Sequence, residues 1–210
     1  MRSETSGGVR GCNRDRREVL EKVTFANQIT IVRILLIPVF IGLAIYYGES
    51  VARGAANESL RWWTITVFGV ASLSDGLDGF VARHFNQRSQ LGAILDPLAD
   101  KLLLLSALVT LSFTSWRQQF PLWFPLLVIF RDLASIGGAF IVDHVAGKCL
   151  IRPHWTGKVA TFAQMAAVLW LMLDLPYLVW PTAVAAAFTI VSGFLNLADG
   201  IKQIQQSGHA

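Results

Sequence analysis

The stretch SDGLDGFVARHFNQRSQLGAILDPLADK, residues 74–101, contains four aspartates at the point where two long apolar segments meet. These segments, residues 62–83 and 93–115, have the length and composition of membrane-spanning helices. An ionisable side chain at bilayer depth costs about 2.5 to 3.5 kcal/mol, so four carboxylates together need compensating cations or a wet cavity. The stretch therefore predicts two membrane helices that carry an acidic site.

The rest of the chain is also unusually apolar. Hydrophobic residues make up 53% and charged residues 15% of its 210 residues, outside the usual range for a soluble domain. Further apolar stretches cover residues 29–47, 121–145, 157–174 and 178–200, with short polar or proline-containing joints between them. We therefore expect an all-α integral membrane bundle of six transmembrane helices.

The ends of the chain are more polar than this bundle. Residues 14–26 place Val19, Leu20 and Val23 on one helical face against charged residues on the other, which predicts an amphipathic helix in the membrane interface. We expect three parts: a cytoplasmic N-terminal segment with this helix (1–26), the six-helix membrane domain (27–202) and a C-terminal tail (203–210).

The distribution of lysine and arginine predicts the orientation. Twelve of these residues fall in the two ends and in the second-to-third and fourth-to-fifth connections, against three in the other connections. Because lysine and arginine concentrate on the cytoplasmic side, we expect the acidic site to face the cytoplasm of a multi-pass protein, in the bacterial inner membrane. Cys12 and Cys149 both fall on that side, and they support neither a disulfide framework nor a thiolate metal site.

The spacing of the four aspartates predicts two carboxylate pairs. Asp75 and Asp78 are three residues apart and Asp96 and Asp100 are four apart, so each pair shares a helical face. Carboxylates this close would repel one another and take up protons unless a divalent cation neutralised them. Hard oxygen ligands without histidine or cysteine favour Mg²⁺ or Mn²⁺, and two ions are expected.

Small residues and one arginine accompany the aspartates. Gly79 follows Asp78, and Gly92 precedes Asp96 by one turn, so a substrate could approach the backbone there. Arg83 lies four residues after Gly79 and is placed to bind a phosphate. Two alternatives stay open at this point, because membrane carboxylates also serve proton relay or cation transport, and glycines also serve helix packing.

The same stretch fits the pattern D-x2-D-G-x2-A-R-x8-G-x3-D-x3-D at every fixed position. In this the chain resembles the CDP-alcohol phosphatidyltransferases, over about residues 24–200. The resemblance implies a CDP-linked lipid such as CDP-diacylglycerol as donor, two divalent cations held by the aspartates, and membrane lipids as surroundings. It also implies no nucleic-acid partner, and members of the family are commonly homodimers.

Individual roles follow from the resemblance by position. It implies that the aspartates are metal ligands and that Asp100 is also the general base. The residues that it assigns to the CDP-lipid are Gly79, Arg83, Ser89, Gly92, Asn27 and Thr30.

The acceptor alcohol depends on a second group of residues. Arg131 lies beside Asp132 inside an apolar stretch, and Arg152 and Lys158 flank the start of the fifth helix. A basic pocket there would suit an acceptor that already carries a phosphate. The alternative is that Arg131 pairs with Asp132 or extends to the interface, and that Arg152 and Lys158 meet lipid headgroups.

Two acceptors remain open. The stretches GKVATFAQM (157–165) and NQITIVRILLIPVF (27–40) resemble phosphatidylglycerophosphate synthases, which use glycerol 3-phosphate. Those enzymes usually carry Arg-Glu and a second arginine eight residues on, whereas this chain has Asp132 and Ala139. The stretch RDLASIGGAF (131–140) instead resembles cardiolipin synthases of the same superfamily, which use phosphatidylglycerol. We favour glycerol 3-phosphate, with phosphatidylglycerol second and an inositol phosphate or another alcohol behind them.

Overall fold

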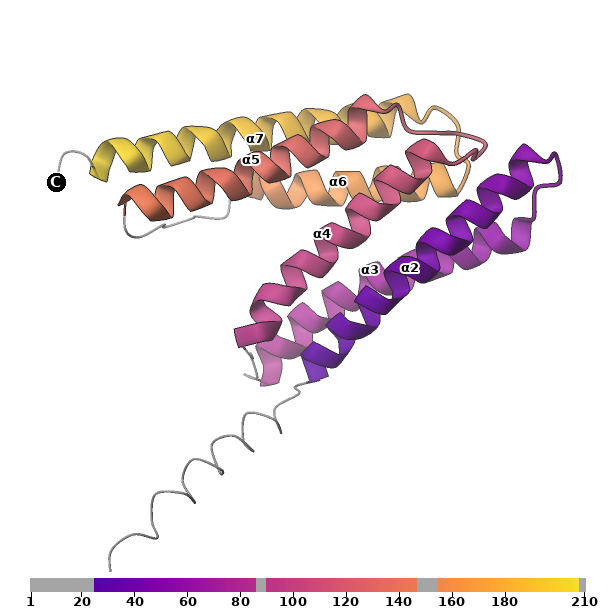
Figure 1. Ribbon diagram of the computed structural model, residues 1–210, viewed down its shortest axis with the longest axis horizontal. Helices are drawn as coiled ribbons and strands as arrows, with labels where there is room; N and C mark the ends of the chain where they lie inside the picture. Colours follow the sequence, from indigo (N-terminus) through magenta and orange to yellow (C-terminus); the bar gives the residue numbers. More distant parts are fainter. Residues whose placement is uncertain (1–24, 86–89, 147–154, 208–210) are drawn as a thin grey trace, which may run out of the picture. The chain divides into compact units, whose positions relative to one another are not determined.

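The structure is a computed structural model that describes the backbone of residues 25–85, 90–146 and 155–207, and side chains within 31–74, 99–138 and 155–201. Over these ranges the chain is all helical. The helices are α2 (Phe25–Ala52), α3 (Glu58–Phe85), α4 (Gln90–Phe113), α5 (Trp123–Ala146), α6 (Trp155–Met172) and α7 (Val179–Ser207) (Figure 1). The all-α prediction is confirmed for these residues, and one helix covers most of each of the six apolar stretches. Most of the expected amphipathic helix, residues 14–24, lies outside the described residues.

Two segments among the described residues are long and apolar enough to cross a membrane. They are Ile31–Ala52 in α2 and Val179–Ile201 in α7. Large apolar side chains on several helices are exposed, a surface that lipid accepts and water does not. Examples are Leu35, Leu126, Phe130, Trp180 and Phe194. The count of six spans remains a prediction.

The chain divides into two compact units, and α2, α3 and α4 run through both. The first unit contains the first part of α2 up to Ile37, together with residues 69–103 from α3 and α4. Its core includes Ala71, Ala99 and Leu103, and it also buries the side chain of Arg33. The Arg33 Nε atom donates a hydrogen bond to the carbonyl oxygen of Ala71 at 3.2 Å, which ties α2 to α3. This unit contains the motif stretch.

The second unit contains residues 38–68 and the chain from Leu104 onward. Near α2 its core is aromatic: the Phe40 and Phe68 rings lie 5.6 Å apart, and the Tyr47 and Trp116 rings 4.5 Å apart. Further along the chain, α5 and α6 both pack against α7 (Figure 1). Gln164 of α6 donates to the Thr189 Oγ1 atom of α7 at 2.7 Å, so this buried amide has a polar partner.

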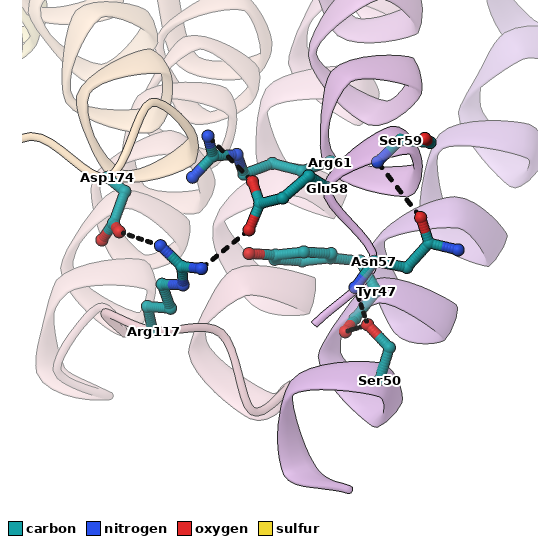
Figure 2. A network of polar contacts seen from close by, with 8 residues as sticks. All are labelled: Tyr47, Ser50, Asn57, Glu58, Ser59, Arg61, Arg117 and Asp174. Atoms are coloured by element: carbon teal, nitrogen blue, oxygen red, sulfur yellow. Dashed lines mark hydrogen bonds and ion pairs between the residues drawn. The ribbon is translucent and has the colours of Figure 1, made fainter. Parts of the chain in front are cut away.

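Polar side chains join two helix connections to the start of α3 within the second unit (Figure 2). Arg117, between α4 and α5, pairs with Glu58 at 2.7 Å and with Asp174, after α6, at 3.1 Å. Asp174 has a φ of 56°, a left-handed conformation that aspartate tolerates better than most residues. Asn57 caps α3 by accepting a hydrogen bond from the Ser59 amide at 3.1 Å. The arginine thus holds two connections to the start of α3.

Candidate functional site

The motif stretch lies on two helices of the first unit. Asp75, Asp78, Gly79 and Arg83 belong to α3, whereas Gly92, Asp96 and Asp100 belong to α4. Both helices are continuous across these positions, so each aspartate pair lies on one helical face as the spacing predicts. The side chains of these residues other than Asp100 are outside the described residues, and their roles remain predictions.

Asp100 is the motif residue whose side chain is described. It is half-buried, and its Oδ1 atom is shielded from solvent. Its neighbour one residue earlier, Ala99, is fully buried. A metal ligand or a general base has to be held in place by its surroundings, and partial burial contributes to this.

The donor set of this stretch fits a hard divalent cation. Four carboxylates on two helices of one unit offer only oxygen ligands, which suit Mg²⁺ or Mn²⁺ better than Zn²⁺. Within the part of the chain whose side chains are described, no group of three or more histidine, cysteine or acidic residues forms another metal site. The proposed metal site therefore rests on the chemistry of Asp75, Asp78, Asp96 and Asp100.

The residues assigned to the CDP-lipid are placed only by their backbone. Asn27 and Thr30 lie in the first two turns of α2, and Gly92 lies at the start of α4. Ser89 lies outside the described residues. The first unit therefore contains the helical members of this set, and their contacts remain predictions.

A second candidate site surrounds Arg131 on α5. Its side chain is 11% exposed, and its Nη1 atom pairs with the Asp132 carboxylate at 2.8 Å. The Nη2 atom donates to the Ser192 Oγ atom of α7 at 2.5 Å. The Nε atom is buried and, among the described residues, has no hydrogen-bond partner. Arg131 is thus paired with Asp132, as in the alternative considered for this residue, and its guanidinium lies inside the second unit.

Two glycines bring neighbouring helices close to this arginine. A Cβ atom on Gly157 of α6 would lie 3.1 Å from Arg131 Nη2, tighter than ordinary contact. A Cβ atom on Gly193 of α7 would lie 3.4 Å from Arg131 Cγ. The glycine at position 157 therefore makes room for the guanidinium between α6 and α7.

The other predicted acceptor residues are placed less fully. Lys158 is exposed on α6. It directly follows Gly157, the glycine that lies close to the Arg131 guanidinium. Arg152 lies outside the described residues. Ser135 of α5 accepts a hydrogen bond from Asn196 of α7 at 3.1 Å, a second polar tie between the helices that hold Arg131.

Three residues that contact or support the candidate sites were not predicted from the sequence. Ser192 and Gly157 contact Arg131 from α7 and α6, but their positions in the sequence carry no sign of this partner. Arg33 was detectable, because it is the one charged residue in the apolar stretch 29–47. Its burial marks it as more than a lipid-facing residue.

Comparison with known proteins gives one consistent result. The sequence model of CDP-alcohol phosphatidyltransferases matches residues 23–196. A probable phosphatidylglycerophosphate synthase of Mycobacterium tuberculosis is 32% identical over 184 residues, covering 85% of this chain and 82% of that protein. A CDP-diacylglycerol–glycerol-3-phosphate 3-phosphatidyltransferase of Bacillus subtilis is 35% identical over 182 residues, covering 80% and 90%. A cardiolipin synthase (CMP-forming) of Streptomyces coelicolor is 33% identical over 171 residues, covering 80% and 74%.

Proposed function

The chain belongs to the CDP-alcohol phosphatidyltransferase family, and we propose that it transfers the phosphatidyl group of CDP-diacylglycerol to glycerol 3-phosphate with release of CMP. The observation that carries the acceptor assignment is the buried Arg131 guanidinium between α6 and α7. Membership of an enzyme family also sets aside the cation-transporter alternative. The chain is an enzyme of phospholipid biosynthesis.

The donor half of the reaction is assigned to the first unit. Asp75, Asp78, Asp96 and Asp100 hold two Mg²⁺ or Mn²⁺ ions, which supply positive charge to the pyrophosphate and to the leaving CMP. Arg83 and the backbone at Gly79 and Gly92 bind the CDP portion, with Asn27, Thr30 and Ser89 as further contacts. The fit of an all-carboxylate donor set to hard cations supports this assignment.

Asp100 acts as the general base. The acceptor hydroxyl oxygen forms a bond to the phosphorus of the phosphatidyl group, the bond from that phosphorus to the CMP oxygen breaks, and the hydroxyl proton passes to Asp100. A base has to be within hydrogen-bond reach of the proton and fixed in place. The half-buried position of Asp100, with Oδ1 shielded from solvent, supports this role.

Arg131 binds the phosphate of the acceptor. A guanidinium keeps its charge at all physiological pH values and forms paired hydrogen bonds with phosphate oxygens. In this chain Asp132 and Ser192 hold that group in one orientation, and the buried Nε–H remains as a further donor. Lys158 and Arg152 add positive charge at the start of α6. A choline or ethanolamine acceptor would find the carboxylate of this set, Asp132, already paired with Arg131.

A second acceptor, phosphatidylglycerol, is supported by two observations. The stretch RDLASIGGAF resembles cardiolipin synthases, and the Streptomyces relative carries that name. Phosphatidylglycerol carries its phosphate as a diester, with one negative charge and a bulky lipid portion. Glycerol 3-phosphate is smaller and can carry a second charge, so the two acceptors are separable by experiment.

We place the enzyme in the bacterial inner membrane as a multi-pass protein with the active site toward the cytoplasm. Two helices of spanning length and composition, and twelve lysine and arginine residues against three on the expected sides, support this placement. A homodimer is the assembly that we expect. Cysteine accessibility at Cys149 and at an introduced Arg53→Cys would test the orientation from the two sides.

The proposed reaction is tested by acceptor-dependent release of CMP. Purified protein receives CDP-diacylglycerol, Mg²⁺ and one acceptor at a time from glycerol 3-phosphate, phosphatidylglycerol, inositol phosphate, choline and no acceptor. We expect release of CMP with glycerol 3-phosphate. Release with phosphatidylglycerol alone would replace the acceptor assignment, and no release with any alcohol would defeat the proposal.

A further inference from the structure

Arg33 is a buried charge within a segment that can span a membrane. It lies in the span Ile31–Ala52, its side chain is 1% exposed, and it is among the largest fully buried side chains described. Arginine remains charged in proteins, and burying a charge at such a position is costly. A residue that only filled space between α2 and α3 would be apolar. The arginine therefore needs an account in terms of what it bonds.

One hydrogen-bond acceptor of Arg33 lies one helical turn before the first motif aspartate. The Nε atom donates to the carbonyl oxygen of Ala71 at 3.2 Å, and Ala71 is fully buried. In an α-helix the amide of residue i bonds to the carbonyl of residue i−4. The carbonyl that Arg33 contacts is therefore the one that the helix pairs with the amide of Asp75.

A second side chain bonds to the same turn of α3. The Ser74 Oγ atom donates to the carbonyl oxygen of Val70 at 2.6 Å, one residue before Ala71. Hydroxyl bonds of this kind back to the i−4 carbonyl often bend a helix slightly. Two consecutive carbonyls just before Asp75 thus accept side-chain hydrogen bonds, one of them from another helix.

We propose that Arg33 is a positioning residue for the metal site, which fixes the turn of α3 from which Asp75 and Asp78 extend. This inference rests on the proposed function, because it assumes that those aspartates bind the divalent cations. Arg33 is itself a cation and cannot be a ligand. It acts through the Ala71 carbonyl and hence through the backbone that carries Asp75.

Two substitutions separate this hydrogen bond from the bulk and charge of the side chain. In glutamine the amide nitrogen is as many bonds from the backbone as the arginine Nε atom, so Arg33→Gln keeps a donor toward Ala71 without the charge. Arg33→Met has about the length of the glutamine side chain and loses both donor and charge. Affinity for Mn²⁺, read from the electron paramagnetic resonance signal of the free ion, requires neither the donor lipid nor the acceptor.

We expect Arg33→Met to weaken Mn²⁺ binding about tenfold or more. The Mn²⁺ affinity of Arg33→Gln should remain within about threefold of that of the protein with the original arginine. Equal affinities for the two variants would overturn the inference, whether both were normal or both weak. Tighter binding by Arg33→Met would also overturn it, because that result would show the arginine to be a repulsive charge.

Controls separate this inference from the proposed function. Arg53→Met removes an exposed arginine of the second unit and should leave Mn²⁺ binding unchanged. Asp96→Asn should lose Mn²⁺ binding if the aspartates hold the metal.

If the unchanged protein bound no Mn²⁺, the metal site itself would fail. If it bound Mn²⁺ and the two Arg33 variants behaved alike, only the positioning role would fail. Dissociation constants are calculated from the concentration of folded protein. A variant that folds less well but binds Mn²⁺ with normal affinity would therefore contradict the positioning role of Arg33.

Discussion

The Arg131 Nη2 atom donates a hydrogen bond to the Ser192 Oγ atom across α5 and α7 at 2.5 Å. The two residues are 61 positions apart in the sequence, so the contact depends on helix packing within the second unit. Together with the Asp132 pair at 2.8 Å, it fixes both terminal nitrogens of the guanidinium. A side chain held in this way is oriented before a phosphate arrives, which lowers the entropy lost on binding.

Removing the serine hydroxyl should weaken acceptor binding. Ser192→Ala leaves the charge of Arg131 in place but frees its Nη2 atom, so we expect the KM for glycerol 3-phosphate to rise about five- to tenfold with kcat little changed. The matched control is Ser135→Ala, which removes a different polar tie between α5 and α7 at 3.1 Å. A similar rise in KM for both variants would show that general helix packing is responsible.

Adding a methyl group at Gly157, beside the Arg131 guanidinium, should weaken binding of the acceptor. In Gly157→Ala the new Cβ would lie 3.1 Å from Nη2, so the guanidinium has to shift by a few tenths of an ångström. We expect the KM for glycerol 3-phosphate to rise about threefold or more, because a charged hydrogen bond depends strongly on geometry. The same measurement on Gly193→Ala, whose Cβ would make ordinary contact at 3.4 Å, should differ little from the unchanged enzyme.

Both alanine variants should remain folded, because alanine has a helix propensity up to about 1 kcal/mol better than glycine. Thermal unfolding in detergent measures this. A higher KM in Gly193→Ala than in Gly157→Ala would contradict the placement of the guanidinium between α6 and α7.

Asp100→Asn should remove turnover and spare binding of the donor lipid. The amide cannot accept the acceptor proton as a carboxylate does, so we expect kcat to fall about 10²- to 10⁴-fold. Binding of CDP-diacylglycerol, measured by titration calorimetry in the presence of Mg²⁺, should remain largely intact. Near-normal turnover by this variant would exclude Asp100 as the base.

Arg117 should contribute to stability and not to catalysis. Its hydrogen bond with Asp174, and next the nearby charge of Glu58, raise the pKa of Arg117 above its ordinary value. A raised pKa of this kind gives stability that is present below the ordinary pKa and is lost only as the pH rises through the raised one. Arginine is charged throughout the neutral range in any case, so the contribution of the network in Figure 2 to stability should not change with pH there.

Arg117→Gln should lower the melting temperature by a few degrees in low salt and by less in about 1 M salt, because salt screens exposed charges. Release of CMP should be unchanged. The comparison is Arg53→Gln, which removes the pair between Arg53, just after α2, and Glu49 four residues earlier. A decrease that did not depend on salt would contradict an electrostatic role for the network.

Hydropathy predicted that these helices exist more accurately than it predicted the residues at which they begin and end. The apolar stretch at 62–83 begins at a tryptophan pair, but α3 begins at Glu58 because Asn57 supplies the cap. At the other end of the chain, α7 continues through polar residues to Ser207, beyond the apolar stretch that ends at 200. Window hydropathy detects the apolar interior of a helix and is insensitive to capping bonds and to polar turns.

The candidate site was predictable where the residues are close in sequence. The aspartate spacing placed two pairs on helical faces. Adjacency in sequence accounts for the Arg131–Asp132 pair, which was the alternative to a role of Arg131 in acceptor binding. Ser192 was not predictable, because a serine in an apolar stretch carries no sign of a partner on another helix. Arg33 could have been found as a lone charge in an apolar stretch, but its link to Ala71 required the packing of α2 on α3.

Transfer of the phosphatidyl group to glycerol 3-phosphate is tested most directly by measuring labelled acceptor in the lipid product. Radiolabelled glycerol 3-phosphate is incubated with the purified enzyme, Mg²⁺ and CDP-diacylglycerol, and label is measured in the organic phase together with CMP in the aqueous phase. We expect equal amounts of labelled phosphatidylglycerophosphate and CMP. Both should be lost on removal of Mg²⁺ and strongly reduced in Asp100→Asn. Release of CMP without label in the lipid would contradict this transfer.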